Sequence, residues 1–142
     1  MKKTKVFVDS DVVISSLLSS RGAAYFLLNQ ANLELYISNI SHLELAEVSH
    51  RMGIGRGKLQ ALVKVKFKKI KLKNDIEGLK KRFKEYTLDP DDAHIVAGAA
   101  SAKVRFLISY NIKDFKAEMI KQDFKIITTT PAKLLQYLRS IS

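Results

Sequence analysis

Two acidic residues stand beside apolar runs, where an ionised carboxylate is costly unless positive charge compensates it. Asp9 directly follows residues 6–8 (Val-Phe-Val), a run typical of a buried central strand. Asp92 heads the apolar face of a helix predicted over residues 90–102. Each has a plainer interpretation, because Asp9 fits an N-cap of the next helix and Asp92 complements a helix dipole.

A third acid, Glu44, lies in a helix predicted over residues 41–52. A rotation of about 100° per residue places Glu44 beside Val48, on the inward stripe. Glu47 falls on the outer side, where it can pair with Arg51 four residues on. We therefore treat Glu44 as a candidate site residue and Glu47 as an ordinary surface acid.

Three converging carboxylates require a counter-ion, and a hard divalent cation with oxygen ligands, Mg²⁺ or Mn²⁺, fits them. Such a metal suits phosphodiester hydrolysis, because it lowers the pKa of bound water and polarises phosphate. Residues 56–84 hold twelve Lys or Arg against two acids, most of the net charge of +11. This cluster favours nucleic acid as a partner, although a basic surface that only keeps the protein soluble is an equal alternative. The candidate contacts are Arg56, Lys58, Lys64, Lys66, Lys68 and Lys69.

Strands that alternate with helices must position these acids. We predict strands over residues 5–9, 33–38, 67–72, 104–109 and 124–128, and helices over residues 12–19, 22–31, 41–52, 58–66, 75–86 (capped by Asn74) and 90–102 and from Pro131. This order predicts one domain, residues 1–142, built as a three-layer α/β/α sandwich with a mostly parallel central sheet. Ligands of such sheets bind beyond the carboxyl ends of the strands, where the candidate acids are expected.

Four short motifs, in this order, resemble those of PIN-domain nucleases. They are Val6-Phe7-Val8-Asp9-Ser10-Asp11-Val12-Val13-Ile14, Ile37-Ser38 followed by Glu44-Leu45, Asp89-Pro90-Asp91-Asp92-Ala93-His94-Ile95, and Leu107-Ile108-Ser109-Tyr110-Asn111-Ile112-Lys113-Asp114-Phe115. Together they extend over nearly the whole chain, and the resemblance implies a PIN-like form of the predicted sandwich.

The resemblance also implies roles for the residues of these motifs. Asp9, Glu44 and Asp92 would be the catalytic, metal-binding acids. Many members of the family have Asp where this chain has Asn111, so Asp114 is the alternative fourth metal ligand. The supporting residues would be Asp11, Ser38, Ser109 and Asn111, with the two serines as hydroxyl groups near strand ends rather than nucleophiles.

Small members of the family are often VapC-like toxins, which are ribonucleases neutralised by an antitoxin and commonly dimeric. The resemblance therefore implies an Mg²⁺- or Mn²⁺-dependent endoribonuclease that hydrolyses RNA. It also implies a cognate antitoxin protein as partner and a homodimer.

Two other functions fit part of the sequence. Residues 9–13 also match the Asp-x-Asp motif of haloacid-dehalogenase-like phosphatases, in which Asp9 would be a covalent nucleophile and Asp11 its acid. That mechanism needs a later acidic pair at a strand end, whereas Asp91 and Asp92 begin a helix. The departure at Asn111 also leaves open a catalytically inactive module that binds nucleic acid or an antitoxin.

The remaining composition limits the environment. The chain has no cysteine, which excludes disulfides and thiolate zinc sites and favours a reducing cytoplasm. No apolar run approaches the roughly 18 residues of a membrane span, and no signal peptide is apparent, so we expect a soluble, unprocessed protein. The imidazoles of His42, His50 and His94 are expected to be structural or surface groups, and Phe7, Phe26, Phe67, Phe106 and Phe124 are expected in the core.

Overall fold

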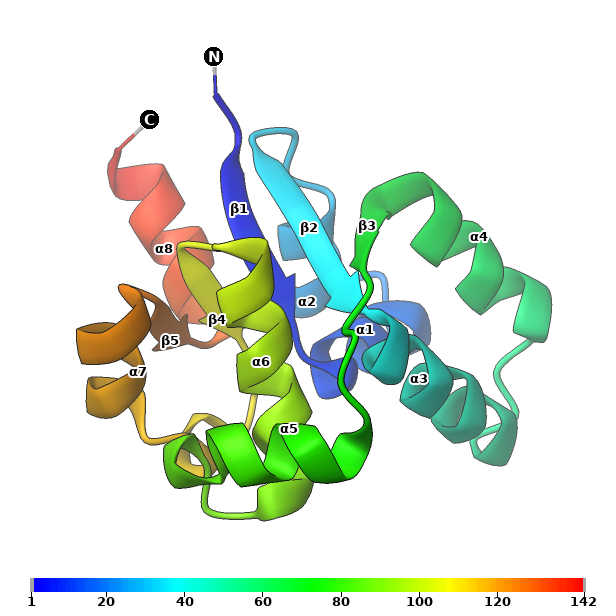
Figure 1. The fold of residues 1–142 in the computed structure, drawn as a ribbon. Coiled ribbons are helices and arrows are strands. Elements are labelled where there is room, and N and C mark those ends of the chain that lie inside the picture. Colours follow the sequence, from blue (N-terminus) through cyan, green and yellow to red (C-terminus); the bar gives the residue numbers. More distant parts are fainter. Residues whose placement is uncertain (1, 142) are drawn as a thin grey trace.

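A computed structural model describes residues 2–141 and has a five-stranded sheet between two layers of helices (Figure 1). The strands are β1 (Thr4–Val8), β2 (Leu33–Ser38), β3 (Phe67–Ile70), β4 (Phe106–Ile108) and β5 (Ile127–Thr129). They lie in the order β3-β2-β1-β4-β5, and each neighbouring pair is parallel. The predicted α/β/α sandwich with a mostly parallel sheet is confirmed.

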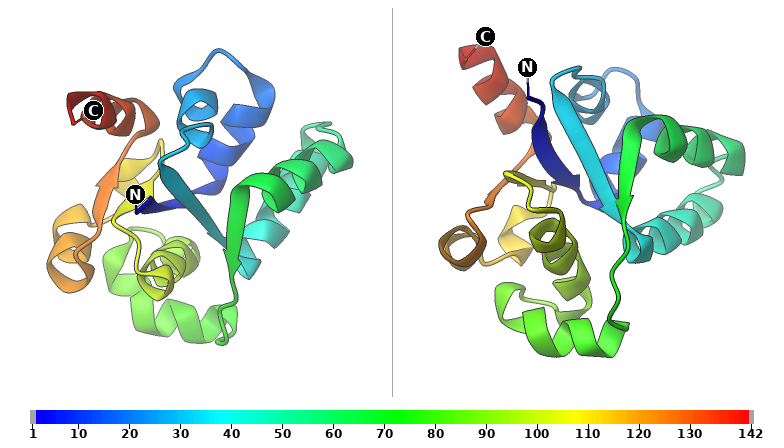
Figure 2. Two further views of the ribbon diagram at one scale, coloured as in Figure 1. Left: turned by 90° about the horizontal axis from the view of Figure 1, so that it is seen from above. Right: turned by 45° about the horizontal axis from the view of Figure 1, so that its top comes forward.

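Helices cover both faces of the sheet (Figure 2). One face carries α1 (Ser10–Leu18), α2 (Ala23–Leu28), α3 (Asn39–Arg51), α4 (Arg56–Lys66) and α8 (Pro131–Ser140). The other carries α5 (Ile76–Phe83), α6 (Ala93–Ala102) and α7 (Ala117–Phe124). Three short 3₁₀ turns lie between these elements, η1 (Lys84–Tyr86), η2 (Pro90–Asp92) and η3 (Ile112–Asp114). Among the described residues, no helix combines the length and apolar character needed to cross a bilayer.

The apolar core is divided in two, because successive side chains of a strand point to opposite faces of the sheet. Val6 and Val8 pack with α1, α2, α3, α4 and α8, whereas Phe7 between them packs with α6 and α7. All three are fully buried, and β1 has a neighbouring strand on each side. Asp9, the residue that follows β1, is therefore attached to a strand buried on both faces.

Several predicted boundaries are wrong. The strand predicted over residues 124–128 is the end of α7 followed by β5, because Lys125 takes a left-handed conformation (φ 60°) that ends the helix after Phe124. Asp75 rather than Asn74 caps α5, since its carboxylate accepts a hydrogen bond from the Gly78 N–H. Phe26 is half exposed rather than buried, because α2 turns Leu27 and Leu28 to the core.

Helix α6 differs from the predicted amphipathic helix. Eight of its residues are buried, including His94 and Gly98. The helix is covered on nearly all sides because it packs against the sheet and also against α5 and α3. Gly98 approaches the sheet closely, at the ring of Phe7.

We expect Gly98→Ala to destabilise the protein. A Cβ at this position would stand 2.6 Å from ring atoms of Phe7, and the buried ring cannot swing into solvent. The free energy of unfolding, measured in urea, should fall by about 1–3 kcal/mol. Gly57→Ala in the exposed first turn of α4 is the control, because its Cβ would meet nothing within 4 Å. Equal stability of the two variants would contradict this packing.

Candidate active site

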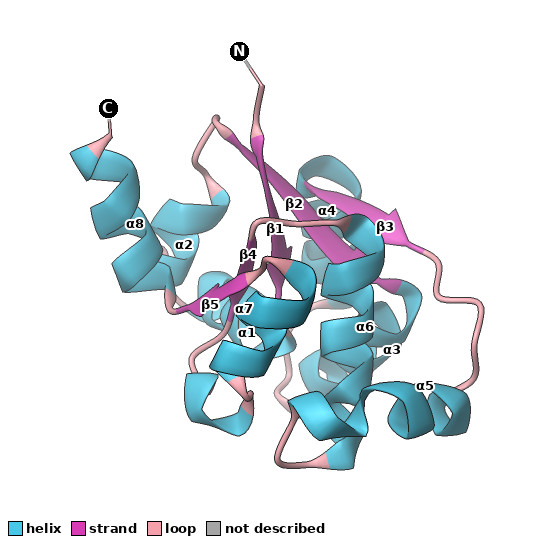
Figure 3. Cartoon of the chain, turned by 60° about the vertical axis from the view of Figure 1, so that its left-hand side comes forward, coloured by secondary structure: helices cyan, strands magenta, loops and turns pink. Residues whose placement is uncertain are grey.

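The carboxyl ends of the parallel strands lie at one edge of the sheet, together with the starts of α1 and α3 (Figure 1). The turn η2 brings the start of α6 to the same edge, near α3 (Figure 3). Asp9 and Asp92 come from these strand ends and helix starts, and Glu44 lies in the second turn of α3. These acids therefore lie along the same edge of the sheet.

Asp9 follows the last residue of β1 and is 9% exposed. Its Oδ1 accepts a hydrogen bond from the Ser10 N–H at 2.7 Å, and its Oδ2 accepts one from the Ser109 hydroxyl at 2.8 Å. Burial, then the charges of Asp11 and Asp92, raise the pKa of Asp9 to about 7, although both hydrogen bonds act to lower it. Asp9 also caps α1, so its capping and site interpretations are compatible.

Asp11 connects the first motif to the fourth. Its Oδ2 accepts hydrogen bonds from the Tyr110 N–H at 3.0 Å and the Asn111 side-chain amide at 3.2 Å, and contacts the Ser109 hydroxyl at 3.4 Å. Burial raises the pKa of Asp11, and the hydrogen bond from Tyr110 opposes that rise. Asn111 is thus a donor to Asp11, a role that an ionised Asp could not fill.

Asp92, the last residue of η2, is partly buried. Burial raises its pKa most, followed by the charges of Asp89 and Asp114, and Glu44 acts in the same direction. Asp92 therefore lies within electrostatic reach of acids from the second and fourth motifs as well as of Asp9. Sequence reasoning gave no part to Asp89, whose motif position offers no signal beyond its capping role.

Glu44 does not lie on the inward stripe of α3, as the rotation argument predicted. The buried residues of that helix are Ser41, Leu45 and Ser49, and the Glu44 side chain is 48% exposed. It reaches His94 of α6, whose Nε2 lies 3.0 Å from Glu44 Oε1. The signal for His94 was available, because it is the titratable residue of a helix otherwise made of Ala, Ile, Val, Gly and Ser.

The two predicted supporting serines are fully buried at strand ends. Ser38 caps α3, because its hydroxyl oxygen accepts a hydrogen bond from the Ser41 N–H at 3.0 Å. Ser109 donates to Asp9 and accepts from the Asn111 N–H at 3.0 Å. Both hydroxyls are engaged in holding neighbouring groups.

A sequence profile of the PIN domain matches residues 5–113. The chain belongs to the PIN-domain family. This membership confirms the resemblance drawn from the four motifs. It leaves the phosphatase alternative without support, since Asp91 and Asp92 end η2, just before α6, and do not close a strand.

Solved structures of similar fold come from toxin-antitoxin systems. A toxin-antitoxin complex from Klebsiella pneumoniae shares 25% identity at a TM-score of 0.62, with 89% of this chain and 97% of that chain covered. VapBC2 from Rickettsia felis, bound to a DNA fragment of its promoter, shares 15% sequence identity at a TM-score of 0.56, with 89% of this chain and 98% of that chain covered. Mycobacterium tuberculosis VapC20, a toxin that cleaves the sarcin-ricin loop, shares 17% sequence identity at a TM-score of 0.54, with 72% of this chain and 86% of that chain covered. A search of curated proteins gave no significant match.

The predicted nucleic-acid contacts of this PIN domain are spread over two elements. Arg56, Lys58, Lys64 and Lys66 lie on α4, and Lys68 and Lys69 lie on the edge strand β3. Some already have partners within the fold. The ammonium of Lys58 donates to the Leu17 carbonyl at 3.2 Å, and Lys68 pairs with Glu34 at 3.1 Å.

The acids of the PIN domain supply oxygen donors suited to a hard cation. In residues 2–141, no three His, Asp or Glu side chains stand close enough to form a finished metal site, so the predicted convergence is at electrostatic range. The buried Oδ1 of Asp11 has no hydrogen-bond partner among the described residues. Together with the raised pKa of Asp9, this means that the site lacks compensating positive charge, and its donors fit Mg²⁺ or Mn²⁺.

Replacing Asp9 by Asn should stabilise the metal-free protein near neutral pH. The pKa of Asp9 is 3.8 in its unperturbed state and about 7 in the fold, so between these values unfolding releases a proton and stability falls as pH rises. The full difference corresponds to on the order of 4 kcal/mol. In EDTA, urea melts across this pH range should show a loss of stability for the wild type and a smaller loss for Asp9→Asn.

Glu118→Gln is the matched control, because it removes an exposed carboxylate from the first turn of α7. It should keep the pH dependence of the wild type. If Asp9→Asn also keeps the pH dependence of the wild type, ionisation of the Asp9 carboxylate does not destabilise the fold.

Proposed function

We propose that this PIN domain is a divalent-metal-dependent endoribonuclease, the toxin of a toxin-antitoxin pair. The observation that carries the proposal is the gathering of acids around a buried Asp9 with a pKa of about 7. A set of carboxylates that raise one another's pKa values is suited to holding a cation rather than to structural pairing.

Asp9, Glu44, Asp92 and Asp114 would hold Mg²⁺ or Mn²⁺. When bound, such a cation supplies Lewis-acid chemistry, activating water and offsetting negative charge on a phosphodiester. The protein's own contribution is positioning. Ser109 fixes Asp9 and touches Asp11, while Asn111 and the Tyr110 N–H hold Asp11 in place.

The toxin role and the partner are drawn from the similar structures. The Klebsiella protein was solved as a toxin-antitoxin complex, and VapC20 is a toxin that cleaves the sarcin-ricin loop. We propose RNA as the substrate of this chain and a cognate antitoxin as its protein partner. We also propose that this chain forms the homodimer implied by the family resemblance.

Asp92→Asn should abolish RNA cleavage without unfolding the protein, because the acid lies partly buried among other acids and has no structural ion pair within residues 2–141. Wild-type protein should degrade RNA with Mg²⁺ or Mn²⁺ and lose the activity in EDTA. Glu47→Gln is the control, since Glu47 is exposed on α3 and forms no ion pair with Arg51 in the described chain. In growing bacteria, the wild type should arrest growth and Asp92→Asn should not.

Three results would count against this function. Wild-type cleavage rates in Asp92→Asn would remove the proposed site. Phosphate release from small phosphomonoesters with intact RNA would favour a phosphatase. RNA or antitoxin binding without cleavage would favour an inactive binding module.

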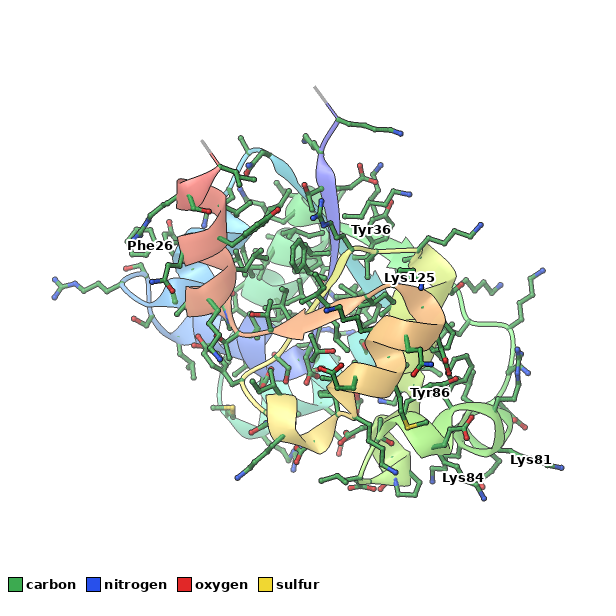
Figure 4. All side chains as sticks on the ribbon, turned by 90° about the vertical axis from the view of Figure 1, so that its left-hand side faces the viewer. Phe26, Tyr36, Lys81, Lys84, Tyr86 and Lys125 are labelled. Carbon is green, nitrogen blue, oxygen red and sulfur yellow. The ribbon has the colours of Figure 1, made fainter. Side chains whose placement is uncertain are left out.

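RNA is proposed to reach the site past the segment that follows β3. Ile70 lies opposite Ser38 in the sheet, and the Leu72 N–H donates to Asn39 Oδ1 at 2.8 Å. Lys71 and Lys73 are therefore exposed at the same edge as Asp9, next to the start of α3. Farther along the chain, Lys81 and Lys84 point outward from the end of the molecule that α5 occupies (Figure 4).

Lys71→Ala with Lys73→Ala should weaken RNA binding and raise KM with little change in kcat. The slope of log affinity against log salt should fall by about 0.7 for each lost phosphate contact. Lys64 and Lys66 are among the contacts predicted from the sequence, but they lie at the end of α4, where the chain enters β3 at the opposite edge. Lys64→Ala with Lys66→Ala removes the same charge and should therefore affect RNA binding less. An equal effect from both double variants would show that only net charge matters.

A further inference from the structure

His94 is the titratable side chain of α6, whose other buried residues are Ala, Ile, Val and Gly. It is 5% exposed, and its Nε2 lies 3.0 Å from Glu44 Oε1. Its Nδ1 is buried and has no hydrogen-bond partner among residues 2–141. The 3.0 Å approach to Glu44 is thus the one contact at ion-pair distance that the imidazole makes within the described chain.

This arrangement does not favour the fold by itself. A buried polar atom without a partner costs free energy. An apolar side chain of similar volume would fill the space beside α3 without that cost. Packing therefore gives no reason for an imidazole at position 94, and its contact with Glu44 is the remaining explanation.

Glu44 depends on this contact more than Asp9 or Asp11 depends on any one partner. Asp9 and Asp11 each accept at least two hydrogen bonds from neighbouring groups. Glu44 has a longer side chain that is 48% exposed, and its contact within residues 2–141 is with His94. A free Glu side chain samples several rotamers, and restricting them in advance removes an entropic cost from ligand binding.

We propose that His94 is a positioning residue whose Nε2 holds the Glu44 carboxylate beside Asp92, ready for a divalent cation. The inference rests on the proposed metal-dependent function. Because the imidazole is buried, it reaches neither RNA nor a reacting phosphate and acts through Glu44. Two helices that follow different strands, α3 and α6, are thereby coupled at the site.

The test compares wild type with His94→Leu, His94→Gln and His50→Leu. Leu removes the donor and keeps an apolar volume, Gln restores a donor near the position of Nε2, and His50 is an exposed imidazole on α3. Three quantities are measured for each protein: the Mn²⁺ dissociation constant by electron paramagnetic resonance, the Mg²⁺ concentration for half-maximal RNA cleavage, and the urea midpoint in EDTA.

His94→Leu should raise the Mn²⁺ dissociation constant and the Mg²⁺ requirement by about ten- to thirtyfold, the equilibrium effect of releasing a Glu side chain. Its urea midpoint in EDTA should equal or exceed that of the wild type. His94→Gln should recover most of the Mn²⁺ affinity, and His50→Leu should match the wild type throughout.

Unchanged Mn²⁺ affinity in His94→Leu would overturn the proposal. So would a lower urea midpoint together with lost affinity and no recovery in His94→Gln, because that pattern marks a purely structural residue. If the wild-type protein neither binds Mn²⁺ nor cleaves RNA, the proposed function itself fails, and this inference fails with it.

Discussion

The burial of one carboxylate at the end of the central strand is the constraint on which the site depends. Val6, Phe7 and Val8 are fully buried, so Asp9 begins in a layer from which water is excluded. The carboxylate is retained there by the Ser109 hydroxyl from the neighbouring strand β4 and by the Ser10 N–H. These bonds do not cancel the cost of burial, since the pKa remains raised to about 7. The fold therefore creates a local demand for positive charge that its own described side chains do not meet.

The parallel topology determines which residues lie near the buried carboxylate of Asp9. All strands end at one edge, so each strand end and following helix start can add a polar group there. Motifs that are far apart in the sequence meet in this way, as the bond between Ser109 and Asp9 shows. The division of the core by alternate residues matters equally, because it places α3 and α6 on different faces, and the two helices are in contact.

Local rules predicted the parts of the fold that are fixed locally. The apolar run before Asp9 and the Asp-Pro opening at Asp89 have unambiguous signals, and both elements occur as predicted apart from their exact ends. Side-chain direction depends on tertiary packing and was predicted less well. Glu44 was placed inward because the rotation argument assumed a stripe containing Val48, whereas α3 buries Ser41, Leu45 and Ser49. His94, expected to be a structural or surface group, is buried because α6 is covered on nearly all sides. The bond between Asn111 and Asp11 had no sequence signal at all.

Charge acts at two distances in this molecule. An acidic edge repels phosphates, so a polyanion can approach only if the surrounding field is positive. The net charge of +11 supplies such a field, but screening limits it to roughly 8–10 Å at physiological salt, so the placement of each lysine decides its effect. Lys68 and Lys80 are paired with Glu34 and Asp91, whereas Lys71 and Lys73 are exposed after β3, at the edge where the strands end. Close to the site, the surface lysines cannot neutralise the carboxylates one by one. The acids are partly buried, and lysines are excluded from the layer around Asp9. A small, multiply charged cation can approach the buried carboxylates directly. The need for such a cation arises from the burial of the acids and not from the net charge of the protein.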